Sequence, residues 1–129
     1  MKAGGPRTLA LAAAGAALAA GGLARLGRVE VAGTSMAPAL EDGDRLVYLR
    51  TRRVRPGQVV VVRDPRERGR LMVKRVARRA PGGVEVTGDN PGASTDSRHF
   101  GVVADALVVG RVLYRYAPPE RAGLTRAGG

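Results

Sequence analysis

From residue 29 onward the chain alternates between short segments rich in Val, Leu and Tyr and clusters of turn-forming residues. Gly, Pro, Asp and Asn fill the clusters, for example at residues 41–44 and 88–92, and no helical periodicity is evident beyond residue 30. The sequence therefore predicts a mainly β domain, a coiled antiparallel β-sheet. The expected strands are 29–32, 45–49, 58–63, 71–78, 84–87 and 107–116.

The N-terminal segment has a different character. Between Thr8 and Ala24 there are 17 residues without a charge, flanked by basic residues on both sides. This length is the lower edge of the roughly 17–25 residues that span a bilayer as a helix, and its Ala-rich composition makes insertion marginal. An uncleaved anchor fits the length and flanks best, while a cleavable signal peptide and a helix lying against another surface stay open.

A length of 129 residues allows one domain. We expect a hydrophobic anchor helix in residues 1–28, the β domain in 29–117 and a disordered tail in 118–129, where few groups can be buried. The protein is then expected at the cell membrane as a single-pass protein. Basic residues on both sides of the span leave open which side of the membrane holds the domain.

Composition excludes several classes of protein. There is no Cys and only one His, His99, so disulfides, cysteine-protease chemistry and a multi-His metal site are ruled out. We predict neither a metal nor a cofactor. The net charge of +11 comes from 22 basic residues, all arginines except Lys2 and Lys74. These arginines are scattered and aromatic residues make up only 3 %, which favours contact with anionic lipid over nucleic acid.

Three segments contain candidate catalytic residues, and each has an ordinary structural explanation when taken alone. Ser35 leaves a strand between Gly33 and Pro38, a setting that can display a hydroxyl but is also common in turns. Lys74 lies in an apolar strand in which Met72 and Val76 share its face. A desolvated amine can lose its proton near neutral pH, unlike a guanidinium, although strand lysines often extend to water.

The third segment is a polar loop that contains Ser94, Asp96 and Arg98. Ser94 can orient a lysine amine through a hydrogen bond, and Asp96 can pair with Arg98 and rigidify the loop.

In this order the three segments read Gly-x-Ser-Met-x-Pro (33–38), Val-Lys-Arg-Val (73–76) and Gly-Asp-Asn-x3-Ser-x-Asp-Ser-Arg (88–98). They resemble the conserved boxes of the bacterial signal peptidase I family of serine/lysine proteases over residues 29–115. The resemblance implies a coiled β-sheet fold of the signal peptidase type. It also implies that Ser35 is the nucleophile, Lys74 the general base and Ser94 the hydroxyl that orients the lysine, with Asp96 and Arg98 as a supporting ion pair.

Two departures from that family stand out. Gly33 occupies the place where some members have a Ser that donates to the oxyanion, and only 13 residues separate Lys74 from the third box, where larger members carry an extra β domain. This minimal form looks most like the short subgroup of nickel-type superoxide dismutase maturation proteases. The implied substrate is a precursor protein with an N-terminal leader, the dismutase precursor in that subgroup, and the alternative is general processing of secreted preproteins.

Two rival interpretations remain. A Ser/His/Asp triad built on His99 would be a different catalytic scheme, and a non-enzymatic basic module that binds lipid or nucleic acid would also explain the charge. A self-cleaving repressor shares the Ser/Lys chemistry, but no DNA-binding helices precede the domain. The sequence leaves the cut site and the oligomeric state open.

Overall fold

The computed structural model describes residues 24–125, so most of the expected anchor, residues 1–23, and the last four residues lie outside it. Within the described part the chain folds mainly as β-sheet, as the sequence predicts. The strands are β1 (Leu26–Glu30), β2 (Arg45–Arg50), β3 (Val59–Asp64), β4 (Glu67–Ala80), β5 (Gly83–Thr87), β6 (Val103–Ala104), β7 (Val108–Ala117) and β8 (Gly123–Leu124). The helical turns are η1 (Pro91–Ala93), α2 (Ser97–Phe100), η2 (Asp105–Leu107) and η3 (Pro119–Arg121).

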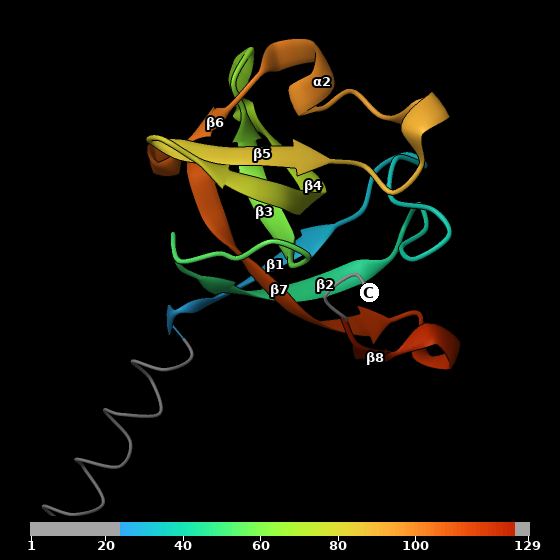
Figure 1. Ribbon diagram of the computed structural model, residues 1–129. Coiled ribbons are helices and arrows are strands. Elements are labelled where there is room, and N and C mark those ends of the chain that lie inside the picture. Colours follow the sequence, from blue (N-terminus) through green and yellow to red (C-terminus); the bar gives the residue numbers. More distant parts are fainter. Residues whose placement is uncertain (1–23, 126–129) are drawn as a thin grey trace, which may run out of the picture.

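All strands pair antiparallel in one sheet of order β1-β2-β7-β3-β4-β5-β6, with β8 added beside β7. The sheet is strongly coiled, and the long strand β7 runs from the end near β6 to the end near β8 (Figure 1). Register shifts in β2, β3, β4 and β7 accompany the coiling, since a bulge increases local twist. All six strands expected from the sequence are present.

The four consecutive valines of β3 show why the sheet coils around two hydrophobic clusters. Val59 and Val61 point into one cluster and Val60 and Val62 into the other, because successive side chains of a strand alternate between faces. The first cluster contains Val31, Met36, Leu40, Leu46, Tyr48, Val73 and Val112 in addition. The second contains Val54, Met72, Val76, Val84, Val86, Val103 and Val108.

Both ends of the described chain differ from the sequence prediction. Strand β1 begins at Leu26, inside the segment expected to be the anchor, and Gly27 lies against the Tyr48 ring where a Cβ has no room. Residues 118–125, which belong to the segment predicted to be a disordered tail, include η3 and β8. Arg121 binds the carboxylate of the buried Asp44 at 3.1 Å, so ion pairing holds a segment that has few apolar groups to bury.

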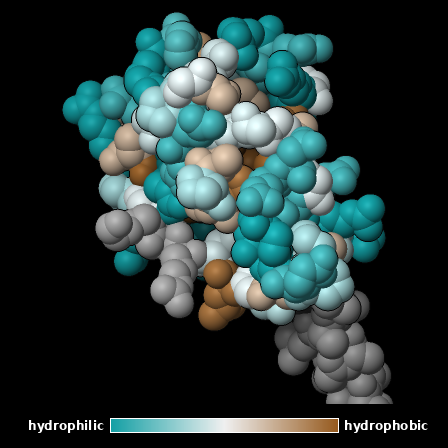
Figure 2. All heavy atoms as spheres, turned by 90° about the vertical axis from the view of Figure 1, so that its right-hand side faces the viewer, coloured by the Kyte–Doolittle hydropathy of each residue, from teal (hydrophilic) through white to brown (hydrophobic). Residues whose placement is uncertain are grey.

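No helix of residues 24–125 is long and apolar enough to cross a membrane. The face turned toward the viewer in Figure 2 is mostly hydrophilic, with hydrophobic residues visible between hydrophilic ones near its middle. The loops 31–44 and 88–96 project on this side of the sheet (Figure 1), and they carry the candidate site residues Ser35, Ser94 and Asp96.

Candidate active site

Ser35 lies in a loop whose two ends are hydrogen-bonded to each other. The Val31 N–H donates to the Asp44 carbonyl, and the Gly43 N–H donates to the Val31 carbonyl, each at 2.8 Å. Met36 is completely buried in the first hydrophobic cluster. The buried Met36 side chain therefore fixes the position of the neighbouring Ser35, which is itself partly accessible to solvent.

Gly33 has a structural reason to be glycine. Its φ angle is +84°, a region that L side chains rarely adopt, and its N–H donates to the Asp42 carboxylate at 2.7 Å. A serine at this position would be strained in this loop conformation. The departure from the signal peptidase pattern at this position thus follows from the backbone.

Lys74 lies in the middle of β4, with only 5 % of its surface exposed. It shares its face with Met72 and Val76 of the second cluster, as the strand alternation predicts. Burial lowers the pKa of Lys74, opposed by the negative charge of Asp96, and nearby arginines lower the pKa further. A base that must be neutral near physiological pH needs a shift in this direction.

A chain of hydrogen bonds sets the direction of the amine. The Lys74 Nζ donates to the Ser94 Oγ at 3.2 Å, and the Ser94 hydroxyl donates to the Asp96 Oδ2 at 2.7 Å. Because the hydroxyl proton is used on Asp96, Ser94 offers the lysine an acceptor lone pair. One N–H of the amine is then used on Ser94, and the nitrogen lone pair can face elsewhere.

Asp96 is completely buried and satisfied by several donors. The Gly88 N–H donates a hydrogen bond to Asp96 at 2.9 Å. Arg98 forms a bidentate ion pair with Asp96 through Nε at 2.8 Å and Nη2 at 2.5 Å. Burial alone would raise the pKa of Asp96, but hydrogen bonds from Arg98, Gly88 and Ser94 outweigh burial and hold it well below its usual range. The carboxylate is therefore a permanently charged acceptor for Ser94, and the expected pairing of Asp96 with Arg98 is present.

The loop that carries Ser94 is tied directly to the loop that carries Ser35. The Asn90 N–H donates to the Ser35 carbonyl at 2.8 Å, and the Asn90 side-chain amide donates to the Thr34 carbonyl at 3.1 Å. Gly88 lies at the same junction, where a Cβ would stand 2.6 Å from the Ser35 carbonyl oxygen and still closer to the Ser94 hydroxyl. From the sequence Gly88 and Asn90 are recognisable as turn residues of the third box, but their contacts with the Ser35 loop are not.

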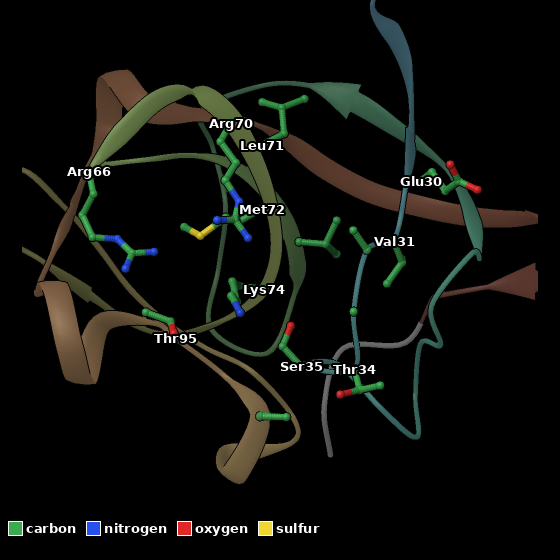
Figure 3. A pocket seen from close by; sticks show the side chains of 14 residues that line it. Glu30, Val31, Thr34, Ser35, Arg66, Arg70, Leu71, Met72, Lys74 and Thr95 are labelled. Atoms are coloured by element: carbon green, nitrogen blue, oxygen red, sulfur yellow. The ribbon is translucent and has the colours of Figure 1, made fainter.

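Ser35 and Lys74 line one cleft of about 340 Å³. Within it the two side chains point toward one another (Figure 3). Its walls are two backbone segments, residues 30–35 and 70–74, with Arg66, Ala93 and Thr95 completing the lining. On the side away from β3, no described strand pairs with residues 70–74, because β5 begins its pairing at Arg75. An extended peptide can add to such an open edge.

His99 is placed differently. Its Nδ1 accepts the Asp96 N–H at 3.3 Å as part of a capping box at the start of α2, and it is not among the residues that line the cleft. More than half of its side chain is exposed. Its ring nitrogen therefore serves helix capping, and this geometry does not support a triad with Ser35.

Residues 22–113 match the Peptidase S24-like family. The chain belongs to this family. It is also 37 % identical over 123 aligned residues, covering 74 % of this chain and 73 % of the relative, to the mitochondrial ATP-independent inner membrane protease subunit 1a of Arabidopsis thaliana. Membership in the Peptidase S24-like family makes the chain a protease that acts on protein substrates, and it supports the signal-peptidase-like resemblance seen in the sequence.

Proposed function

We propose that the chain is a membrane-associated serine endopeptidase in which Ser35 is the nucleophile and Lys74 the general base, and that it removes an N-terminal leader from a precursor protein. The observation that carries the proposal is the Lys74–Ser94–Asp96 chain of hydrogen bonds beside Ser35 in one cleft. The Lys74 amine is buried, burial lowers its pKa against the opposing charge of Asp96, and Ser94 fixes its direction. Those are the properties that a lysine base requires.

Acylation begins when the neutral Lys74 amine accepts the proton of the Ser35 hydroxyl. The Ser35 oxygen attacks the scissile carbonyl carbon, and a tetrahedral intermediate with a negatively charged oxygen forms. When the C–N bond breaks, Lys74 returns the proton to the departing amine. The product with the new N-terminus leaves, and the leader remains attached to Ser35 as an ester.

Deacylation repeats the same proton transfers with water. Lys74 accepts a proton as a water molecule attacks the ester carbonyl, and the proton then passes to the Ser35 oxygen as the ester bond breaks. The leader leaves with a free carboxylate, and both residues return to their starting states. Ser94 orients the amine throughout the reaction, because the Ser94 hydroxyl keeps its proton and donates it in a hydrogen bond to the Asp96 carboxylate.

The negative charge of the intermediate needs a donor. None of the hydrogen bonds among residues 24–125 uses the backbone N–H of Ser35, so that N–H is available for the oxyanion. Gly33 has no side-chain donor, and its N–H is already used on Asp42. We therefore assign the Ser35 N–H as the oxyanion donor contributed by this loop.

The substrate is proposed to bind as an extended strand between residues 30–35 and 70–74, whose backbones line the cleft. A leader peptide suits this site, because a flexible segment can adopt a strand without unfolding a domain. The relative is named as a subunit of an inner membrane protease, which supports a leader-removing role at a membrane. The narrower prediction is the nickel superoxide dismutase precursor, and the alternative is a secreted preprotein.

Membrane attachment is proposed to come from the uncharged segment of residues 8–24, as a single-pass anchor, because strand β1 begins at Leu26. A spanning helix would resist extraction by high salt and alkaline carbonate, whereas attachment of the +11 chain by charge alone would be reversed by salt.

The proposal is tested by incubating the full-length protein with each precursor separately and sequencing the N-terminus of the product. One new N-terminus at the leader junction, absent when Ser35→Ala replaces the wild type, supports a leader peptidase. The precursor that is cleaved identifies the substrate class. If neither is cut while the protein binds lipid or nucleic acid in a salt-sensitive way that survives Ser35→Ala, the chain is a binding module and the proposal is wrong.

A further inference from the structure

The cleft beside Ser35 and Lys74 is unevenly charged. Besides Lys74, its lining includes two arginines, Arg66 and Arg70, against a single carboxylate, Glu30. Figure 3 shows Arg66 and Arg70 extending into the same space from one side, while Glu30 lies at the opposite end. When Lys74 is neutral, as catalysis requires, the arginines remain the positive groups of the cleft.

The two arginines differ in what already binds them. Arg66 is held by Asp64 through two side-chain hydrogen bonds of 3.1 and 2.9 Å, and its guanidinium stacks on the Phe100 ring at 5.5 Å. Its charge is largely compensated by the buried Asp64 carboxylate. Arg70 has no hydrogen bond or ion pair with any residue of the described range 24–125, and its side chain is exposed to the cleft.

We propose that Arg70 is a specificity-determining residue that binds an acidic side chain of the substrate, three to five residues from the scissile bond. The inference rests on the proposed function and names a feature of the substrate of that same site. A guanidinium presents a planar pair of donors that matches a carboxylate, so a Glu or Asp side chain is the natural occupant.

The distance from the scissile bond follows from the strand. Arg70 and Lys74 are four residues apart on β4, which is about 13 Å at the usual rise of a strand. An extended peptide that lies along residues 70–74 advances by the same rise per residue. A substrate residue about four positions from the bond attacked by Ser35 therefore lies opposite Arg70, and the length of both side chains allows one position either way.

The geometry favours a peptide over an anionic lipid headgroup as the occupant. Arg70 shares its cleft with Ser35 and Lys74 and stands beside an open strand edge, where a peptide must lie to be cut. Two acidic groups could compete with a substrate carboxylate. Glu30 lies at the other end of the cleft, and Asp64, which interacts with Arg70 only through charge, forms its side-chain hydrogen bonds with Arg66.

The test uses peptides that span the leader junctions of both precursors, the dismutase precursor and a secreted preprotein, with Glu or Gln placed in turn at each position up to six residues on either side. For one position, or two neighbours, within three to five residues of the bond, we expect kcat/KM to be about three- to tenfold higher for Glu than for Gln. High salt should reduce that ratio. In Arg70→Gln the ratio should fall to about one.

The matched control is Arg68→Gln, which removes the same charge from the same strand at a residue outside the cleft lining. It should keep the wild-type ratio. Because Arg70 also lowers the pKa of Lys74, its loss changes the rate on every peptide, and the Glu-to-Gln ratio at a single pH cancels that general effect. Arg70→Glu should reverse the preference toward a peptide with Lys at the same position.

A measurement of peptide binding tests the role of Arg70 even where no cleavage occurs. Fluorescence anisotropy of the labelled Glu and Gln peptides on Ser35→Ala, with and without Arg70→Gln, should show tighter binding of the Glu peptide only when Arg70 is present. Absence of cleavage by the wild type with this binding preference intact would count against the protease and not against Arg70. Equal ratios in wild type and Arg70→Gln would overturn the inference. So would an Arg70 effect confined to binding of phosphatidylglycerol vesicles.

Discussion

The backbone N–H of Asn90 donates a hydrogen bond of 2.8 Å to the carbonyl oxygen of Ser35, which joins the loop that carries Ser94 to the loop that carries Ser35. The Asn90 side chain adds a second bond to the Thr34 carbonyl. The loop that fixes the direction of Lys74 through Ser94 is therefore also the loop that fixes the position of Ser35. In the proposed mechanism, the position of the nucleophile Ser35 is therefore coupled to the position of Ser94, which orients the base Lys74.

Gly88→Ala should disturb this junction. A Cβ at Gly88 would stand 2.6 Å from the Ser35 carbonyl oxygen and closer still to the Ser94 hydroxyl, so one of the two loops must shift. We expect kcat to fall by about 10²-fold, because a displacement of about 1 Å in a catalytic arrangement has effects of that size. Steady-state kinetics on a leader peptide measure it.

Gly92→Ala is the matched control for that change. Gly92 lies in the same loop, and a Cβ there meets nothing within 4 Å. It should leave kcat near the wild-type value. Equal losses in both variants would show that the loop tolerates no alanine for reasons unrelated to the Ser35 junction.

Ser94→Ala should lower kcat strongly with little change in KM, because the amine loses the acceptor that directs it while the cleft keeps its shape. The buried Asp96 also loses one donor but retains Gly88 and Arg98, so folding should persist. Thr95→Ala removes the neighbouring hydroxyl and leaves the Lys74–Ser94–Asp96 chain in place. Normal turnover with a lowered Tm in Ser94→Ala would assign Ser94 a structural role alone.

The rate should rise as pH increases through the Lys74 pKa, because only the neutral amine accepts the Ser35 proton. Burial is the largest cause that lowers this pKa, and salt screens nearby charges but hardly affects burial. We therefore expect kcat/KM to climb from neutral into mildly alkaline pH, with a midpoint that moves little between low and high ionic strength. A profile already flat above about pH 6.5, the ordinary pKa of His, would indicate an imidazole base.

Stability should fall in acid. The pKa values of Asp96, Asp44 and Asp64 are lowered in the folded protein, because their hydrogen bonds to arginines and backbone N–H groups outweigh burial. Their contribution is complete above the unfolded-state pKa of about 4 and is lost as pH falls toward the folded-state values. Urea midpoints should thus be constant near neutral pH and drop below about pH 4. A midpoint unchanged at pH 3 would contradict this pairing.

The positions of the strands and the buried orientation of Lys74 were predictable because both follow from local sequence patterns. Turn residues bound each strand, and the alternation of Met72, Lys74 and Val76 places the amine on a buried face whatever the rest of the fold does. Three short boxes predicted Ser94, Asp96 and Arg98 as neighbours, and the structure joins Lys74, Ser94, Asp96 and Arg98 by hydrogen bonds. Their catalytic roles stay predictions.

Other features depend on contacts between distant segments, which no local pattern reveals. Residues 118–125 look unstructured by composition, yet Asp44, 77 residues away from Arg121, holds them in place. The close approach of Gly88 to Ser35 and the turn of Arg70 into the cleft likewise arise only when β4 and the two loops meet. His99 is a case in which the sequence offered a catalytic alternative that the structure does not support, because its ring caps helix α2.

The measurement that tests the central claim most directly compares cleavage of one leader peptide by the wild type, Ser35→Ala, Lys74→Arg and His99→Ala, each with its Tm recorded. Lys74→Met is added as an uncharged variant in case Arg does not fit the buried site. The dyad predicts no detectable cleavage by the folded Ser35 and Lys74 variants, because Arg keeps the charge and cannot act as a base. It predicts activity close to wild type for His99→Ala. Appreciable cleavage by Lys74→Arg together with its loss in His99→Ala would contradict the account.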